Sequence, residues 1–190
     1  MTELEKMLGG LFYDGDDTEL MKMWYKGKKL IQILNQLSPE ELEKRDILLS
    51  KLLGGYGKNS WIVSPFYVDY GSNIYIGDNC QINMNCTFLD DNKIVIGNNV
   101  LIAPNVQIYT AFHPLNFAQR FSKENNHLKI QSLPVFINDN TWIGGGSIIL
   151  PGVIIGENVV IGAGSIVTQN IPDNTIAYGN PCRVVRTNDI

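Results

Sequence analysis

The chain has 190 residues, of which 44% are hydrophobic and 18% charged, so it is long enough for one folded domain with a small appendage. Its formal net charge of −4 leaves no basic field to hold nucleic acid, and no apolar run approaches the roughly 18 residues that a membrane span needs. The polar start of the chain lacks the pattern of a signal or transit peptide, so a cytoplasmic location is expected.

A helical segment is expected over residues 1–57. Thr18 can cap a helix whose apolar residues recur at roughly helical spacing as far as Leu37. The sequence Ser38-Pro39-Glu40-Glu41 is typical of a capping box with proline at the first helical position, and it predicts a second helix. Gly54-Gly55 is expected to end that helix, because glycine accepts the left-handed conformation at a helix C-terminus.

Residues 58–175 carry a six-residue repeat. An aliphatic or aromatic residue opens each unit in three phased blocks: Ile76, Ile82 and Phe88; Ile96, Ile102 and Ile108; and Ile137, Ile143, Ile149, Ile155, Ile161 and Val167. This period is neither helical nor a simple strand alternation, and it predicts a parallel β-helix with the opening residues stacked inside. The glycines and asparagines after the openings are expected at corners with positive φ, and Cys80 and Cys86 are expected to be small packing residues.

Two segments break the repeat. Residues 89–95 displace its phase by two positions, and 29 positions separate Ile108 from Ile137, which is not a multiple of six. A loop over about residues 111–134 must therefore leave the coils, and it contains both histidines, His113 and His127. Because long loops in a compact solenoid are usually functional, this loop is the first place to look for a catalytic group.

The order of these features resembles the galactoside and maltose O-acetyltransferases over nearly the whole chain. The resemblance is carried by DYGSNIYIG from Asp69, LIAPNVQIYTAFHP up to Pro114, the repeats from Asn140 to Pro172, and the tail GNPCRVVR up to Arg186. It implies an all-β solenoid with an α-helical N-terminus: a left-handed parallel β-helix with an extruded loop, assembled as a homotrimer with active sites between subunits. It also implies acetyl-CoA as co-substrate, no required metal, and a tail over residues 176–190 that contributes to CoA binding.

The implied reaction moves an acetyl group from acetyl-CoA to a sugar hydroxyl by direct attack. His113 matches the family's catalytic histidine and is expected to be the general base, because imidazole can take up a proton near neutral pH. Asn83 matches an asparagine at the transition state, where an amide can donate to the oxyanion. Without the resemblance, His113 would be a surface histidine and Asn83 a corner residue. His127 matches no motif and is expected to be solvated.

Further residues match the family's contacts with the two substrates. On the CoA side these are Asn83, Trp142, Gly145, Ala163, Thr168, Gln169, Arg183 and Arg186, of which the arginines suit phosphates because a guanidinium is planar and always charged. On the acceptor side they are Asp14, Asp69 and Asp91, whose carboxylates would accept from sugar hydroxyls. The simpler alternatives are a solvated tail for the arginines and helix caps or turns for the aspartates.

The sequence departs from the family at several positions. Trp24 stands where many relatives carry an arginine that meets the acceptor, Gln169 stands where a lysine is expected near CoA, and the loop from Phe121 to Leu133 is longer. The acceptor can therefore differ: an antibiotic, an amino sugar of a surface glycan or a nodulation-type oligosaccharide. A non-catalytic β-helix scaffold is a further alternative. A γ-class carbonic anhydrase is disfavoured, because it needs three histidines on zinc and this chain has two.

Overall fold

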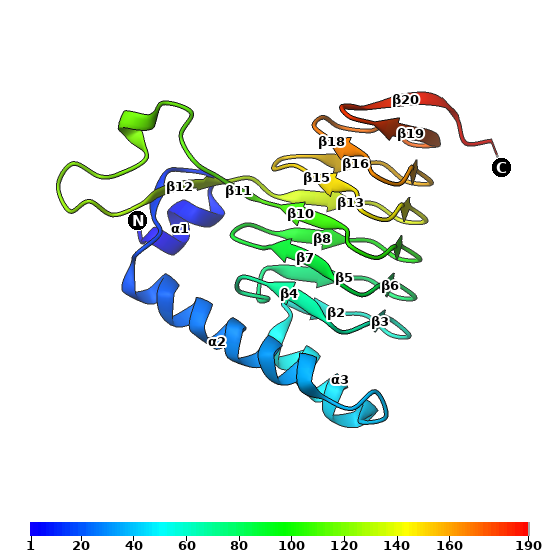
Figure 1. Ribbon diagram of the computed structural model, residues 1–190, viewed down its shortest axis with the longest axis horizontal. Coiled ribbons are helices and arrows are strands. Elements are labelled where there is room, and N and C mark those ends of the chain that lie inside the picture. The colour runs from blue at the N-terminus through cyan, green and yellow to red at the C-terminus, as the bar shows by residue number, and fades with distance from the viewer. Residues whose placement is uncertain (190) are drawn as a thin grey trace.

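The computed structural model describes residues 1–189, and in it a parallel β-helix follows an N-terminal helical segment (Figure 1). The helices are α1 (Glu3–Leu8), α2 (Thr18–Gln36) and α3 (Leu42–Leu52), and the short strand β1 (Tyr13–Asp14) lies between the first two. The helices α2 and α3 cover the N-terminal end of the coils, where their buried leucines and isoleucines join the solenoid core. No helix within residues 1–189 is long and apolar enough to cross a membrane.

The helix ends differ from the sequence expectations. Asp17, rather than Thr18, caps α2, because its carboxylate accepts the N–H groups of the next helical residues at 2.9 and 3.2 Å. The predicted capping box at Ser38 is only half formed: the Glu41 carboxylate accepts the Ser38 N–H at 3.1 Å, but α3 begins only after Glu41 and has no side-chain cap. Gly54 does not end α3 in a left-handed conformation. A Cβ there would lie 2.4 Å from the carbonyl oxygen of Ser72, so close approach requires this glycine.

The strands of the solenoid form three faces of stacked, mostly two- or three-residue strands. Face 1 contains β4 (Phe66–Val68), β7 (Cys86–Leu89), β10 (Gln107–Tyr109), β15 (Ile148–Ile149) and β18 (Ile166–Val167). Face 2 contains β2 (Gly55–Tyr56), β5 (Ile74–Ile76), β8 (Ile94–Ile96), β13 (Val135–Ile137) and β16 (Ile154–Ile155). Face 3 contains β3 (Trp61–Ile62), β6 (Gln81–Ile82), β9 (Leu101–Ile102), β14 (Trp142–Ile143), β17 (Val160–Ile161), β19 (Thr175–Gly179) and β20 (Cys182–Thr187). The chain runs from face 1 to face 2 to face 3 and back.

The opening residues of the repeats form the core, as predicted. Ile82, Ile102, Ile143 and Ile161 are paired from coil to coil along face 3, and each is at most 2% exposed. The small residues that stand four positions after an opening residue are buried as well, and Cys80 and Cys86 are two of them. Burial in this apolar stack raises the pKa of the Cys86 thiol to about 11, which fits a packing residue rather than a nucleophile.

Asparagines occupy the left-handed corners of the coils. Asn79 and Asn99 have φ of 56° and 57°, and their side-chain amides form a ladder in which Asn79 donates to Asn99 at 3.2 Å and Asn99 donates to Asn140 at 3.0 Å. The glycines that precede them do not have positive φ, contrary to expectation. Gly77 is needed for packing instead, because a Cβ there would lie 2.5 Å from the carbonyl oxygen of Gly97 in the next coil.

The irregular segments all leave the coils at the edge between faces 1 and 2. The early coils have 20 residues, as the pairing of Phe66 with Cys86 shows, whereas the later coils have 18, as the pairing of Ile143 with Ile161 shows. The two extra residues fall within 69–73 and 89–93, directly after face 1. The long loop leaves after β10 at the same edge, so three successive coils are modified at one place.

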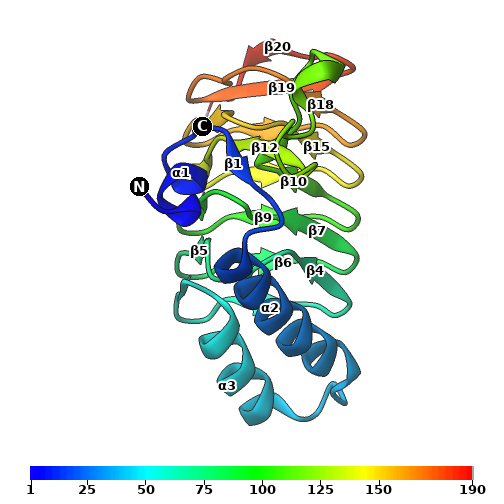
Figure 2. The same ribbon diagram turned by 90° about the vertical axis from the view of Figure 1, so that its left-hand side faces the viewer.

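The loop is anchored by a small antiparallel sheet. Its strands β11 (Ala111–Phe112) and β12 (Lys129–Ser132) pair with each other, and a 3-10 turn (Phe117–Gln119) lies between them. The N-terminal strand β1 pairs with the other side of β12, so residues far apart in sequence lie together beside the solenoid (Figure 2).

Candidate functional site

Buried carboxylates collect at the edge between faces 1 and 2. Asp90 is fully buried and accepts the backbone N–H groups of Asp69, Tyr70 and Asn73 at 3.1, 2.8 and 3.2 Å. Asp91 is 7% exposed. Burial raises the pKa of Asp90 to about 7 and that of Asp91 to about 6, because a charge is poorly solvated there. The two extra residues in each early coil therefore place carboxyl groups with raised pKa values at this edge.

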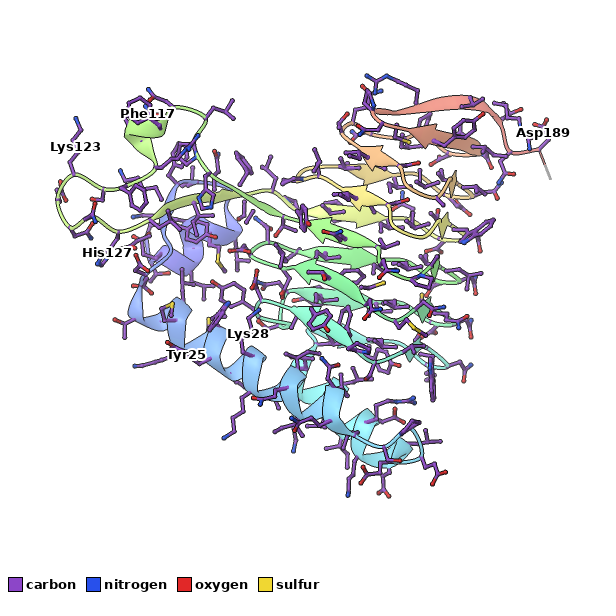
Figure 3. The ribbon with its side chains drawn as sticks, viewed as in Figure 1. Tyr25, Lys28, Phe117, Lys123, His127 and Asp189 are labelled. Atoms are coloured by element: carbon purple, nitrogen blue, oxygen red, sulfur yellow. The ribbon has the colours of Figure 1, made fainter. Side chains whose placement is uncertain are left out.

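Helix α2 supplies the partners of Asp69. The Nζ atom of Lys28 and the indole Nε1 of Trp24 donate to the same carboxylate oxygen at 2.9 and 3.2 Å. Lys28 lies on the side of α2 that faces the coils (Figure 3), and its ammonium stacks over the Trp24 ring at 4.9 Å. The sequence marked Trp24 as unusual but did not point to Lys28. The only sign of Lys28 was its position four residues after Trp24, on the same face of a helix.

The N-terminal strand reaches the same edge through Tyr13. Its hydroxyl donates to Asp91 at 2.6 Å, and its side chain is 2% exposed. Burial, reinforced by the neighbouring Asp91 carboxylate, raises the pKa of Tyr13 well above its usual range, so the phenol stays protonated. One oxygen of Asp91 is thus committed to Tyr13.

His113 directly follows β11 and is exposed. Its Nδ1 atom lies 3.3 Å from the backbone carbonyl oxygen of Lys129 across the hairpin. A carbonyl only accepts hydrogen bonds, so this contact favours the tautomer with the proton on Nδ1. Nε2 then carries the free electron pair, which is the state that a general base requires.

His127 is not simply solvated, contrary to the sequence expectation. Its Nδ1 atom lies 2.7 Å from an Asp14 carboxylate oxygen, and this hydrogen bond raises the pKa of His127 above its usual value. The sequence could not show the pair, because 113 residues separate its members and only the pairing of β1 with β12 brings them together. Asp14, Asp16 and His127 together place three potential metal-ligand atoms within 4.8 Å of one another. The hydrogen bonds of Asp14 with His127 and with the N–H of Asp16 account for this arrangement.

A second group of predicted residues lies at the edge between faces 3 and 1. Asn83 follows β6, and its Oδ1 atom accepts the N–H of Met84 at 2.9 Å, so the amide nitrogen is the end that can donate to a bound group. It is not a left-handed corner residue, since that role belongs to Asn85 with φ of 60°. Gly145 follows β14 at the same edge, and Trp142 on face 3 exposes 52% of its surface.

The remaining predicted CoA contacts lie toward the C-terminal end of the solenoid. Ala163 is exposed after β17, and Arg183 and Arg186 are exposed on β20, which completes face 3. Thr168 and Gln169 follow β18 and lie at the other edge of face 1. One chain therefore brings Asn83, Gly145, Trp142, Ala163 and the arginines to one side, but places Thr168 and Gln169 elsewhere.

His113 and Asn83 are separated by the width of face 1. Asn83 follows β6 at the edge between faces 3 and 1, whereas the loop that carries His113 leaves the coils after β10, at the edge between faces 1 and 2. A general base and an oxyanion donor must both lie near one acyl carbon. In one chain these two side chains therefore stand at opposite edges of face 1.

Two hollows lie around the base of the loop. One, of about 420 Å³, is lined by Phe12, Pro114, Phe121 and Lys129 among others. The other, of about 260 Å³, is lined by Tyr13, Asp14, His127 and Lys129 among others. Both lie on the acceptor side of the predicted site, away from the CoA side.

The chain matches two family models. Residues 6–57 match the maltose acetyltransferase hexapeptide capping motif, and residues 134–169 match the bacterial transferase hexapeptide with its six repeats. A putative acetyltransferase of Saccharomyces cerevisiae is 48% identical over 98% of this chain and 93% of its own length. The galactoside O-acetyltransferase of Escherichia coli is 42% identical over 98% of this chain and 89% of its own length.

Solved structures agree with this match. A maltose O-acetyltransferase from Clostridium difficile 630 has a TM-score of 0.95 at 48% identity, over 100% of this chain and 99% of that chain. A galactoside acetyltransferase in complex with coenzyme A has a TM-score of 0.92 at 40% identity, over 100% and 92%. The predicted fold class, a left-handed parallel β-helix with a helical N-terminus and an extruded loop, is confirmed.

Proposed function

This chain belongs to the hexapeptide-repeat galactoside and maltose O-acetyltransferase family and is an acetyl-CoA-dependent acetyltransferase, and on that premise we propose that it acetylates a sugar hydroxyl with His113 as general base. The observation that carries the proposal is the hydrogen bond between His113 and the carbonyl of Lys129, beside the acidic edge of the solenoid. It orients an exposed imidazole as a proton acceptor on the loop that leaves the coils at the same edge.

The proposed reaction is a direct attack. Nε2 of His113 removes the proton from the acceptor hydroxyl while that oxygen forms a bond to the thioester carbon of acetyl-CoA. The carbonyl electron pair moves onto its oxygen, where the amide of Asn83 and the backbone N–H of Gly145 can donate to the negative charge. When the intermediate collapses, the bond to sulfur breaks and the CoA thiolate leaves, taking up the proton held by His113.

The site is proposed to form between two subunits of a homotrimer. The separation of His113 from Asn83 within one chain supports this arrangement, because a neighbour's Asn83 edge can face the His113 loop where its own edge cannot. Each trimer would then hold three equivalent sites. Acetyl-CoA would lie along Trp142 and Ala163, with its phosphates near Arg183 and Arg186, and the tail 176–190 would contribute to its binding.

Thr168 and Gln169 are proposed to contact CoA from the neighbouring subunit, because they lie at the edge of face 1 that carries the loop. Asp14, Asp69 and Asp91 are proposed to bind the acceptor. Asp69 and Asp91 are held by donors from α2 and β1, so their orientation is fixed before the sugar arrives. Fixed carboxylates lose less entropy when they accept hydrogen bonds from vicinal hydroxyls.

The proposal is tested by incubating the protein with acetyl-CoA and a panel of mono- and disaccharides while thiol release is followed. The variant His113→Ala should be slower by about 10²–10⁴-fold, and Lys29→Ala, an exposed change on α2 outside both hollows, should match the unmodified protein. If no sugar stimulates thiol release, the acceptor is of another class. If His113→Ala keeps full activity, the general base is another group.

A further inference from the structure

His127 and Asp14 connect two segments that border the acceptor side. The strand β1 pairs with β12 so that Asp14 lies opposite Lys129, and Gly15 donates its N–H to the carbonyl of Leu128 at 3.0 Å. Leu128 in turn donates its N–H to Asp16 at 3.2 Å. The imidazole of His127 closes this connection with its 2.7 Å contact to the Asp14 carboxylate.

The pair lies close to the proposed general base. The imidazole of His113 contacts the backbone carbonyl of Lys129, and Lys129 is the residue across from Asp14 in the small sheet. Because β12 lies between β1 and β11, Asp14 is two strand spacings, or roughly 10 Å, from the His113 side of the hairpin. A disaccharide with one hydroxyl at His113 can therefore reach Asp14 with a hydroxyl of its second ring.

Both oxygens of Asp14 have a defined partner. Oδ1 accepts the N–H of Asp16 at 2.9 Å, and Oδ2 contacts Nδ1 of His127. Without the imidazole, the carboxylate would keep only the backbone donor and could rotate about its terminal torsion. Asp14 is only partly buried, so solvent alone would not restrain it.

We propose that His127 is a positioning residue for the acceptor, which holds the Asp14 carboxylate in the orientation that receives a sugar hydroxyl. The inference rests on the proposed sugar acceptor. The inference extends the proposed function by assigning a role to a side chain of the long loop, where the sequence departs from the family pattern. His127 does not touch the reacting atoms and acts only through Asp14.

Protonation of His127 strengthens this arrangement. The Asp14 hydrogen bond raises the pKa of His127, so the charged pair is fully formed below the ordinary histidine pKa and is lost as pH rises through the raised value. The charged groups that face it are Asp14 and Asp16 from the N-terminal segment, and the shared hollow also contains Glu3, Lys6, Glu124 and Lys129. The acids outnumber the bases by four to two in that set, which favours the protonated imidazole.

The experiment compares His127→Ala, His127→Asn and the control Lys29→Ala on the best sugar of the panel, with KM for the sugar, KM for acetyl-CoA and kcat measured separately. In His127→Asn the amide nitrogen takes the approximate place of Nδ1, so a donor to Asp14 is retained but does not titrate. We expect His127→Ala to raise the sugar KM about five- to twentyfold, with kcat and the acetyl-CoA KM changed less than about twofold. His127→Asn should restore most of the sugar KM, and Lys29→Ala should change none of the three.

A second readout follows the imidazole directly. NMR titration of the two histidines should show a raised pKa for His127 that falls toward the ordinary value in Asp14→Asn. The sugar KM of the unmodified protein should rise as pH passes above the His127 pKa, whereas that of His127→Asn should stay level. An unchanged sugar KM in His127→Ala would overturn the inference while leaving the sugar acceptor intact. A protein that acetylates no sugar would overturn both, and the unmodified protein alone reveals that case.

Discussion

A mixed-subunit experiment tests whether the active site is built from two chains. The two perturbations are His113→Ala, which removes the proposed base at the loop edge, and Asn83→Ala, which removes the proposed oxyanion donor at the opposite edge. Each variant alone should be slower, by about 10²–10⁴-fold for the base and about 10²–10³-fold for the oxyanion donor. The question is whether hybrids of the two variants recover activity.

The expected recovery follows from the geometry. The two side chains stand at opposite edges of face 1 in one chain, so in the proposed trimer each site would take its base from one subunit and its donor from the next. In a cyclic trimer that contains both variants, in either ratio, one interface out of three joins an intact His113 to an intact Asn83. Hybrids should therefore regain about one third of the unmodified activity.

The assay uses two affinity tags, one on each variant. Co-expression followed by purification over both tags yields only hybrids, and thiol release from acetyl-CoA in the presence of the acceptor is then measured. Hybrids of His113→Ala with itself, carrying the two tags, control for tag effects and should stay inactive. If the mixed hybrids are no more active than the single variants, the base and the donor work within one chain, and the inter-subunit site is refuted.

The remaining predictions concern stability and the donor side. The free energy of unfolding in urea should fall as pH rises from ~5 to ~8. Folding raises the pKa of Asp90 to about 7 and that of Asp91 to about 6, so the two protonated carboxyl groups stabilise the fold fully below the ordinary aspartate pKa, and this stabilisation is lost as pH rises through the raised values. A pH series of urea midpoints checks this, and a midpoint that rises instead would contradict it. Asn99→Ala should lower the free energy of unfolding by about 1–3 kcal/mol, since φ is 57° and the side chain belongs to the ladder. Asn99→Gly should cost less, and equal losses in urea titrations would refute the role of φ. Trp142→Ala should raise the acetyl-CoA KM at least about fivefold and leave the sugar KM nearly unchanged, as steady-state kinetics would show.

The sequence predicted the coils well because their order is local. An opening residue such as Ile143 must be apolar to stack between Ile102 and Ile161, so the six-residue period survives in the sequence. The asparagine corners were predictable for the same reason, since a positive φ restricts the residue type. The corner glycines Gly146, Gly152 and Gly164 do have positive φ, as predicted. The glycines directly after an opening residue, such as Gly77, were misjudged, because close approach of the next coil requires them and such contact leaves no signal within one repeat.

The acceptor side could be predicted only in part, because its contacts join distant segments. Asp14, Asp69 and Asp91 were predicted as acceptor contacts through a family resemblance, which stays a prediction, and their hydrogen-bond partners were not predicted. Tyr13 bonds Asp91 across 78 positions, and His127 bonds Asp14 across 113. No periodicity relates such pairs, and they become visible only when β1 is placed beside β12.

The two sides of the site are built under different constraints, which explains why the acceptor is the less predictable substrate. The donor residues stand on regular coils, where a change of spacing would disturb the core. The acceptor residues stand at an edge where three coils are already lengthened, so substitutions there cost the solenoid little. Trp24 is such a substitution, and its indole donates to Asp69 at 3.2 Å beside Lys28.

Replacing Trp24 by phenylalanine therefore isolates the acceptor side. The ring and its contact with the Lys28 ammonium remain, but the hydrogen bond to Asp69 is lost. We expect the sugar KM to change by about two- to tenfold while the acetyl-CoA KM and the unfolding midpoint stay nearly constant, since one partly exposed hydrogen bond is removed. A change in the acetyl-CoA KM of equal size would mean that α2 contacts both substrates, and the division of the site into two independently variable edges would then be wrong.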